Sequence, residues 1–153
     1  MMLRDLLARE CVAADLASTT KESVLRELAS LAGPLCRGLS AERLFQALLE
    51  RERLGSTGLA DGLAIPHGRL EGLTQIVGAF GRVRAGIPFD ALDGRPSTLF
   101  FALFAPENAG GDHLKALARV SRILRGESFR RKALEAPDAE ALHRLLCEAD
   151  ERG

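Results

Sequence analysis

The histidines of this sequence are the residues best suited to chemistry near neutral pH, because a neutral imidazole is a good nucleophile with an ordinary pKa of about 6.5. His67 lies in the glycine-rich segment 55–68, which reads GSTGLADGLAIPHG. His113 follows the segment PENAGGD, residues 106–112. The third, His143, has no special neighbours and is interpreted as an ordinary helix residue.

The surroundings of His67 favour an accessible imidazole at the end of a strand. Pro66 holds Ile65 in an extended conformation and presents the next side chain at the strand end. Gly68 leaves room beside the ring, and the other glycines of the segment allow tight turns and close approach of another molecule. Two interpretations remain open here: a turn histidine in a glycine-rich loop, or a reactive group.

His113 is expected in the first turn of a helix that directly follows an apolar strand. Free backbone N–H groups at such a position favour anion binding. His113 is therefore either an ordinary polar first-turn residue or the second member of a site shared with His67, because the ends of two strands can converge in space.

Phosphoryl transfer suits this set of residues, since it needs an in-line nucleophile and donors that hold the equatorial phosphoryl oxygens. His113, Arg51, Ser56 and Thr57 supply donors of the required types. A hydrolytic triad is disfavoured because there is no Gly-x-Ser-x-Gly elbow or suitable cysteine partner. Two histidines without clustered carboxylates or thiolates fall short of a metal site, so no metal and no cofactor are expected.

The elements that must position these residues follow from hydrophobic periodicity. Helical spacing at both ends of the chain predicts helices after the capping signals Thr19–Glu22, Ser40, Asp112 and Ser128 and around Leu142–Leu146. Short apolar runs predict strands over residues 63–65, 76–83 and 99–105. The last run is unbroken, which is typical of a strand covered on both faces. The pattern predicts a single-domain α/β sandwich over residues 1–153, with helices flanking the sheet on both faces.

Composition restricts the classes of function. With 153 residues, 46% of them hydrophobic and 27% charged, the chain fits one globular domain. Lysine plus arginine and aspartate plus glutamate both number 21, which leaves no electrostatic footprint for nucleic acid or an anionic membrane. The longest apolar run is too short to insert into a membrane, and no signal peptide is recognised. Three widely separated cysteines are interpreted as reduced thiols, which predicts a cytoplasmic location.

Residues 51–68, RERLGSTGLADGLAIPHG, closely resemble the active-site segment of enzyme IIA domains of the fructose/mannitol type, from the bacterial phosphoenolpyruvate-dependent phosphotransferase system. FDALDG at 89–94 and PENAGGDHLKALARVS at 106–121 resemble two further blocks of that family, in the same order. The resemblance covers essentially the whole chain. It departs at Leu59-Ala60, where the common pattern has Ile-Gly, and this bears only on local loop flexibility.

The resemblance implies a role for each matching residue. His67 corresponds to the phosphorylated histidine, His113 to the second active-site histidine that assists the phosphoryl group, and Arg51 to an arginine that borders the site. Ser56 and Thr57 correspond to the loop beside it. The implied fold is a mixed sheet between helices, and the implied donor is the histidine phosphocarrier protein.

Within the family, the nitrogen-regulatory branch is the most similar, because the chain has no fused carrier, transporter or transcription-factor segment and contains PENAGGDHLKALAR at 106–119. Its partners would then be regulatory targets, such as a kinase or an ion-transport regulator. The first alternative is a sugar-specific enzyme IIA that passes its phosphoryl group to an enzyme IIB domain. The second is a binding module in which His67 is never phosphorylated.

Overall fold

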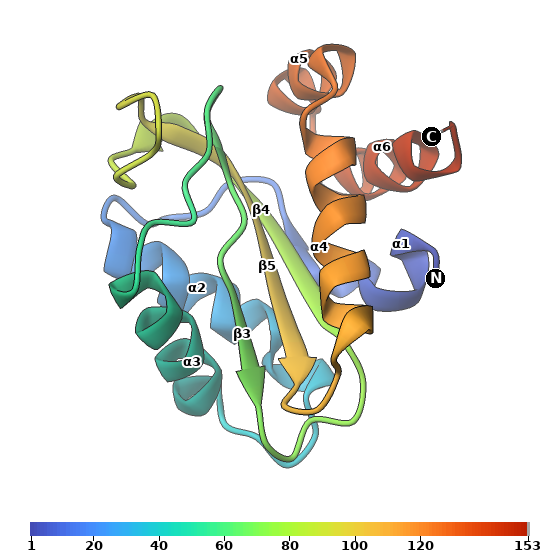
Figure 1. The fold of residues 1–153 in the computed structure, drawn as a ribbon. Coiled ribbons are helices and arrows are strands. Elements are labelled where there is room, and N and C mark those ends of the chain that lie inside the picture. The colour runs from blue at the N-terminus through green and yellow to red at the C-terminus, as the bar shows by residue number, and fades with distance from the viewer. Residues whose placement is uncertain (153) are drawn as a thin grey trace.

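Helices at both ends of the chain enclose a central set of strands in the computed structural model, which describes residues 1–152 (Figure 1). The helices are α1 (Leu3–Leu6), α2 (Lys21–Ala32), α3 (Ala41–Arg53), α4 (Gly111–Leu124), α5 (Glu127–Glu135) and α6 (Ala139–Arg152), with 3-10 turns η1 (Arg9–Cys11) and η2 (Gly33–Leu35). The strands are β1 (Val12–Ala13), β2 (Leu63–Ala64), β3 (His67–Leu70), β4 (Val77–Ile87) and β5 (Ser97–Pro106). Within the described residues, no helix has the length and apolar character needed to cross a membrane.

The strands form one mixed sheet in the order β1-β4-β5-β2, and β3 also pairs with β5. β1 runs parallel to β4, β4 runs antiparallel to β5, and both β2 and β3 run parallel to β5. Helices α2 and α3 pack on one side of this sheet, and α4 and α6 lie on the other (Figure 1). The predicted α/β class with a mixed sheet between helices is therefore confirmed.

Strand β5 lies at the centre of the hydrophobic core. Every residue from Leu99 to Ala105 is no more than 1% exposed, as expected for an apolar run without alternation that is covered on both faces. Phe101 meets Phe80 of β4 edge to face, with ring centroids 6.0 Å apart. The predicted strand over residues 99–105 is confirmed, with one or two further residues at each end.

Strands β2 and β3 are two parts of one edge strand that is interrupted at Ile65 and Pro66. Their register against β5 is continuous, because Ala64 lies opposite Phe100 and His67 lies opposite Leu103. Across the break, the Leu103 N–H donates a hydrogen bond to the Pro66 carbonyl oxygen, at 2.9 Å. His67 was expected just beyond the end of a strand. It instead begins a new one, because pairing resumes directly after the proline.

Several other boundaries differ from the sequence prediction because caps compete locally. The N-cap of α2 is Thr20, whose side chain accepts a hydrogen bond from the Ser23 N–H, so the capping box lies one residue later than expected. Gly110 precedes α4 and Gly126 precedes α5, where Asp112 and Ser128 were expected as caps. These two polar residues lie inside the first turns instead. The short elements α1 and β1 were not predicted, whereas the cap at Ser40 is confirmed.

A fully buried arginine, Arg82 in β4, joins the sheet to the C-terminal helices. Its Nη1 donates to the carbonyl oxygens of Ala133 and Ala136, at 2.7 and 2.8 Å. Its Nε donates to the Ala14 carbonyl oxygen, at 3.0 Å, and its Nη2 lies 3.6 Å from a carboxylate oxygen of Asp15. The guanidinium thus satisfies backbone carbonyls near the end of α5 and after β1.

We expect Arg82→Met to lower the free energy of unfolding by about 3 kcal/mol, because it leaves buried carbonyl oxygens without donors. Arg84→Met is the matched control, since the exposed Arg84 donates one hydrogen bond to the same Ala136 carbonyl and should cost less than about 1 kcal/mol. Urea unfolding followed by circular dichroism measures both values. Equal losses in the two variants would contradict the structural role of Arg82.

Candidate functional site

A pocket of about 440 Å³ lies over β3, between α3 and α4, and it brings both candidate histidines together. Arg51 from the last turn of α3 also lines it, so three of the predicted site residues share one surface. The full lining is Ala47, Glu50, Arg51, Leu54, His67, Gly68, Arg69, His113, Leu114 and Leu117.

Alternation along β3 determines which of its side chains face α4. A Cβ atom on Gly68 would lie 3.1 Å from the backbone and side chain of Ala47, so this position faces α3 at very close range. Successive side chains of a strand point to opposite faces. His67 and Arg69 therefore face the opposite side, where α4 carries His113. The glycine lets α3 approach the strand beside the imidazole.

The hydrogen bonding of His67 distinguishes its two ring nitrogens. Nδ1 lies 2.8 Å from the Ile65 carbonyl oxygen, which can only accept, so Nδ1 carries the proton. The lone pair of the neutral ring is then on Nε2. Burial lowers the pKa of His67 below 6.5; the hydrogen bond to Ile65 opposes this shift, and the charge of Arg51 adds to it. The imidazole is therefore held neutral with Nε2 as its nucleophilic atom.

His113 is 4% exposed and its ring stands nearly perpendicular to that of His67, with ring centroids 5.6 Å apart. Its Nε2 is buried and has no hydrogen-bond partner. Burial lowers the pKa of His113 to about 4, and the nearby His67 and Arg69 contribute further. The two histidines, from separate elements, therefore converge in space, which the sequence had left open.

Arg69 is a site residue that the sequence analysis missed. Its Nε donates a hydrogen bond to Nδ1 of His113, at 3.0 Å. Its two terminal nitrogens lie 3.4 Å from the carbonyl oxygens of Glu107 and Gly110. The signal that could have identified Arg69 is its spacing: it stands two residues after His67, which places both side chains on one face of a strand.

Arg51 and two leucines form the outer part of the pocket. Nη1 of Arg51 donates to the Gly55 carbonyl oxygen, at 2.9 Å, which fixes the guanidinium at the end of α3. Leu54 is 85% exposed and Leu114 is 66% exposed, although both are large apolar side chains. The pocket therefore combines cationic and imidazole groups with an apolar rim.

The hydroxyl groups of Ser56 and Thr57 are engaged within the loop and do not line this pocket. Ser56 Oγ donates to the Phe89 carbonyl oxygen, at 2.7 Å. The buried carboxylate of Glu52 accepts hydrogen bonds from the Thr57 N–H, at 2.8 Å, and from the Thr57 hydroxyl, and it pairs with Lys21 at 3.1 Å. These two residues hold the loop in place, whereas the sequence analysis expected them to support the phosphoryl group directly.

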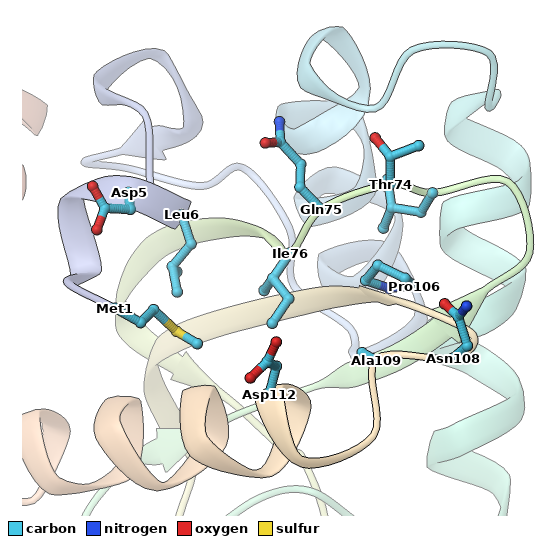
Figure 2. Close-up of a pocket in the computed structure, with 11 residues that line it drawn as sticks. Met1, Asp5, Leu6, Thr74, Gln75, Ile76, Pro106, Asn108, Ala109 and Asp112 are labelled. Atoms are coloured by element: carbon cyan, nitrogen blue, oxygen red, sulfur yellow. The ribbon is translucent and has the colours of Figure 1, made fainter.

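A second, larger pocket of about 670 Å³ lies among α1, residues 73–76 and the loop that leads into α4 (Figure 2). Its lining includes neither His67 nor His113. Two carboxylates, Asp5 and Asp112, line it among apolar, amide and hydroxyl side chains. In residues 1–152, no group of three or more histidine, cysteine, aspartate or glutamate side chains is placed to hold a metal ion. Both candidate histidines therefore belong to the smaller pocket.

The lowered histidine pKa values predict acid destabilisation. In the unfolded chain His113 titrates near 6.5, whereas in the folded protein its pKa is about 4, so between these values the unfolded state binds more protons. The free energy of unfolding should therefore fall as the pH is lowered from about 6.5 to 4, by up to about 3 kcal/mol from this residue. Urea titrations at a series of pH values measure this dependence.

The matched variant for this test is His113→Gln, whose side chain takes up no proton. Its unfolding free energy should depend less steeply on pH over the same window. A slope identical to that of the wild type would show that His113 is not the group responsible.

Comparison with known proteins shows the family of this chain. Residues 5–149 match the family model described as phosphoenolpyruvate-dependent sugar phosphotransferase system, EIIA 2. A nitrogen regulatory protein of Bradyrhizobium diazoefficiens is 43% identical over 146 residues, which covers 95% of each chain. A fructose-specific EIIA component of Haloferax volcanii is 37% identical over 86% of each chain.

Among solved structures, the nitrogen regulatory protein IIA-Ntr of Neisseria meningitidis superimposes with a TM-score of 0.87 at 37% identity. The match covers 93% of this chain and 97% of that one. The fold and the extent of these matches agree with one another. The chain therefore belongs to the EIIA 2 family of the phosphoenolpyruvate-dependent sugar phosphotransferase system.

Proposed function

We propose that this protein is a phosphoryl carrier, acting through one domain over residues 1–153, in which Nε2 of His67 accepts a phosphoryl group from the histidine phosphocarrier protein. The observation that supports this most directly is the hydrogen bond between Nδ1 of His67 and the Ile65 carbonyl oxygen. It leaves the lone pair of Nε2 free in a pocket that Arg51 and His113 also line. Family membership supports the same chemistry.

The transfer is an in-line exchange between two imidazoles. The N–P bond of the donor phosphohistidine breaks, its electron pair returns to the donor nitrogen, and a new N–P bond forms to Nε2 of His67. The proton stays on Nδ1, where it is donated to the Ile65 carbonyl oxygen. This hydrogen bond stabilises the positive charge that develops on the ring.

Two groups are available to hold the transferred phosphoryl oxygens. Nε2 of His113 is buried without a partner, so a phosphoryl oxygen would satisfy it. Arg51 supplies a permanent positive charge at the end of α3. The exposed Leu54 and Leu114 offer a docking partner an apolar surface around the site. We place this activity in the cytoplasm, which agrees with the free thiols of Cys11, Cys36 and Cys147.

His67→Ala should abolish labelling when the protein is incubated with phosphoenolpyruvate, enzyme I and the phosphocarrier. His113→Ala should still be labelled on His67, but about ten- to hundred-fold more slowly, because a hydrogen bond to a charged phosphoryl oxygen is lost. His143→Ala is the matched control and should react like the wild type. The label should be acid-labile and alkali-stable, and NMR should place it on Nε2.

Labelling that survives His67→Ala would refute the assignment of the acceptor. Unchanged kinetics in His113→Ala would show that His113 is an ordinary first-turn residue of α4.

A regulatory role is the output we favour for this carrier. Its support is the nitrogen regulatory protein of Bradyrhizobium diazoefficiens, which matches this chain over nearly the full length of both. Phosphorylation adds nearly two negative charges beside the apolar rim, which is enough to decide whether a partner can dock. The partner is then a regulatory target such as a kinase or an ion-transport regulator.

Sugar transport is the second candidate function, because the fructose-specific EIIA component of Haloferax volcanii is also similar over most of both chains. In that case the phosphoryl group passes from His67 to an enzyme IIB domain. Both functions use the same site, so only the identity of the acceptor or partner separates them.

The two outputs can be separated by affinity capture from a lysate of the native organism. The baits are wild-type protein, His67→Ala, which stays unphosphorylated, and fully phosphorylated protein. We expect a regulatory partner that binds only one of the two states, identified by mass spectrometry. If the only state-dependent partner is an enzyme IIB domain that then phosphorylates a sugar, the regulatory role is wrong and the transport role holds.

A further inference from the structure

We propose that Arg69 is a positioning residue that fixes the tautomer of His113, so that the N–H of Nε2 is the group presented to the phosphoryl group. This inference rests on the proposed phosphoryl transfer at His67. It adds a residue to the site that neither the family resemblance nor the sequence pattern indicated.

The first step is the direction of the hydrogen bond between Arg69 and His113. A guanidinium carries only donors and remains protonated in proteins. Because Nε of Arg69 lies 3.0 Å from Nδ1 of His113, Nδ1 must be the acceptor and carries no proton. In a neutral imidazole the proton is then on Nε2.

The second step is that the ring is neutral and that Nε2 is left without a partner. Burial lowers the pKa of His113 to about 4, so the imidazole is uncharged near neutral pH. Its Nε2 is buried and makes no hydrogen bond in the unphosphorylated protein. A buried donor without a partner is costly, and it is satisfied when an acceptor arrives. A phosphoryl oxygen on the neighbouring His67 is such an acceptor.

The third step is that Arg69 connects the two elements that carry the histidines. It extends from β3, on the same face as His67, and its terminal nitrogens approach the carbonyl oxygens of Glu107 and Gly110 in the loop before α4. The guanidinium therefore fixes the tautomer of His113 and also binds the backbone at the start of α4. Arg69 is an exposed residue, so replacing it does not open the core.

The tautomer can be measured directly on unphosphorylated protein labelled with ¹⁵N-histidine. In the wild type, NMR should show Nδ1 of His113 unprotonated and Nε2 protonated. In Arg69→Leu the tautomer protonated on Nδ1 should appear, because no arginine N–H then donates a hydrogen bond to Nδ1 of His113. Arg53→Leu removes an exposed arginine outside the pocket and should leave the His113 signals unchanged. An unchanged tautomer in Arg69→Leu would overturn the proposal.

A double-mutant cycle separates tautomer control from a general structural effect. Arg69→Leu should slow phosphoryl transfer to His67 by about two- to ten-fold, the range expected for one hydrogen bond. In the His113→Gln background the amide offers an N–H donor whatever Arg69 does, so the same substitution should have little further effect. Equal slowing in both backgrounds would overturn the proposal.

The two hypotheses fail in different ways. If His67 is not the acceptor, the wild-type protein labels elsewhere or not at all, but the NMR result for His113 is unaffected. If Arg69 does not set the tautomer, the NMR signals of His113 are the same in Arg69→Leu as in the wild type, while labelling of His67 in the wild type still proceeds.

Discussion

Each ring nitrogen of a partly buried imidazole needs a hydrogen-bond partner or a ligand, because an unpaired buried polar atom costs free energy. The arrangement of the site depends on this constraint. The break in the edge strand at Ile65 and Pro66 brings a carbonyl oxygen within 2.8 Å of Nδ1 of His67. That contact, made by the chain two residues before the histidine itself, decides which nitrogen is free. Arg69 does the same for His113 from two residues after His67. One short segment of edge strand therefore sets the protonation pattern of both rings.

Hydrogen bonds within the protein hold the loop between α3 and β2 in place. Glu52 accepts from both the N–H and the hydroxyl of Thr57, and Lys21 balances its charge at 3.1 Å. Ser56 is bound to the Phe89 carbonyl in the same way. A family motif can thus contain residues of two kinds. His67 and Arg51 line the pocket, whereas Ser56 and Thr57 hold the backbone that places them.

The sequence predicted the fold class, the long helices and the central strand well, because these depend on hydrophobic periodicity and burial. Glycine, proline and loop context made His67 and His113 candidates with open alternatives, and only the family resemblance implied a role for each. The sequence analysis missed Arg69, because its role depends on pairing with a helix start that lies 44 residues away. It placed Ser56 and Thr57 at the phosphoryl group because hydroxyl donors suit that chemistry. Their actual partners, Phe89 and Glu52, could not be read from residue type alone.

The interrupted edge strand also reduces the unpaired backbone that this edge of the sheet offers to other chains. An uninterrupted edge would present a row of unpaired backbone groups to other chains. Here Pro66 has no N–H to offer, and the Ile65 N–H is bound to the Thr57 carbonyl oxygen at 3.1 Å. The Leu63 carbonyl oxygen accepts from the Leu59 N–H, at 2.7 Å. On this edge of the sheet, the four residues of β3 remain as a template for a foreign strand, fewer than the five or six residues of a common strand.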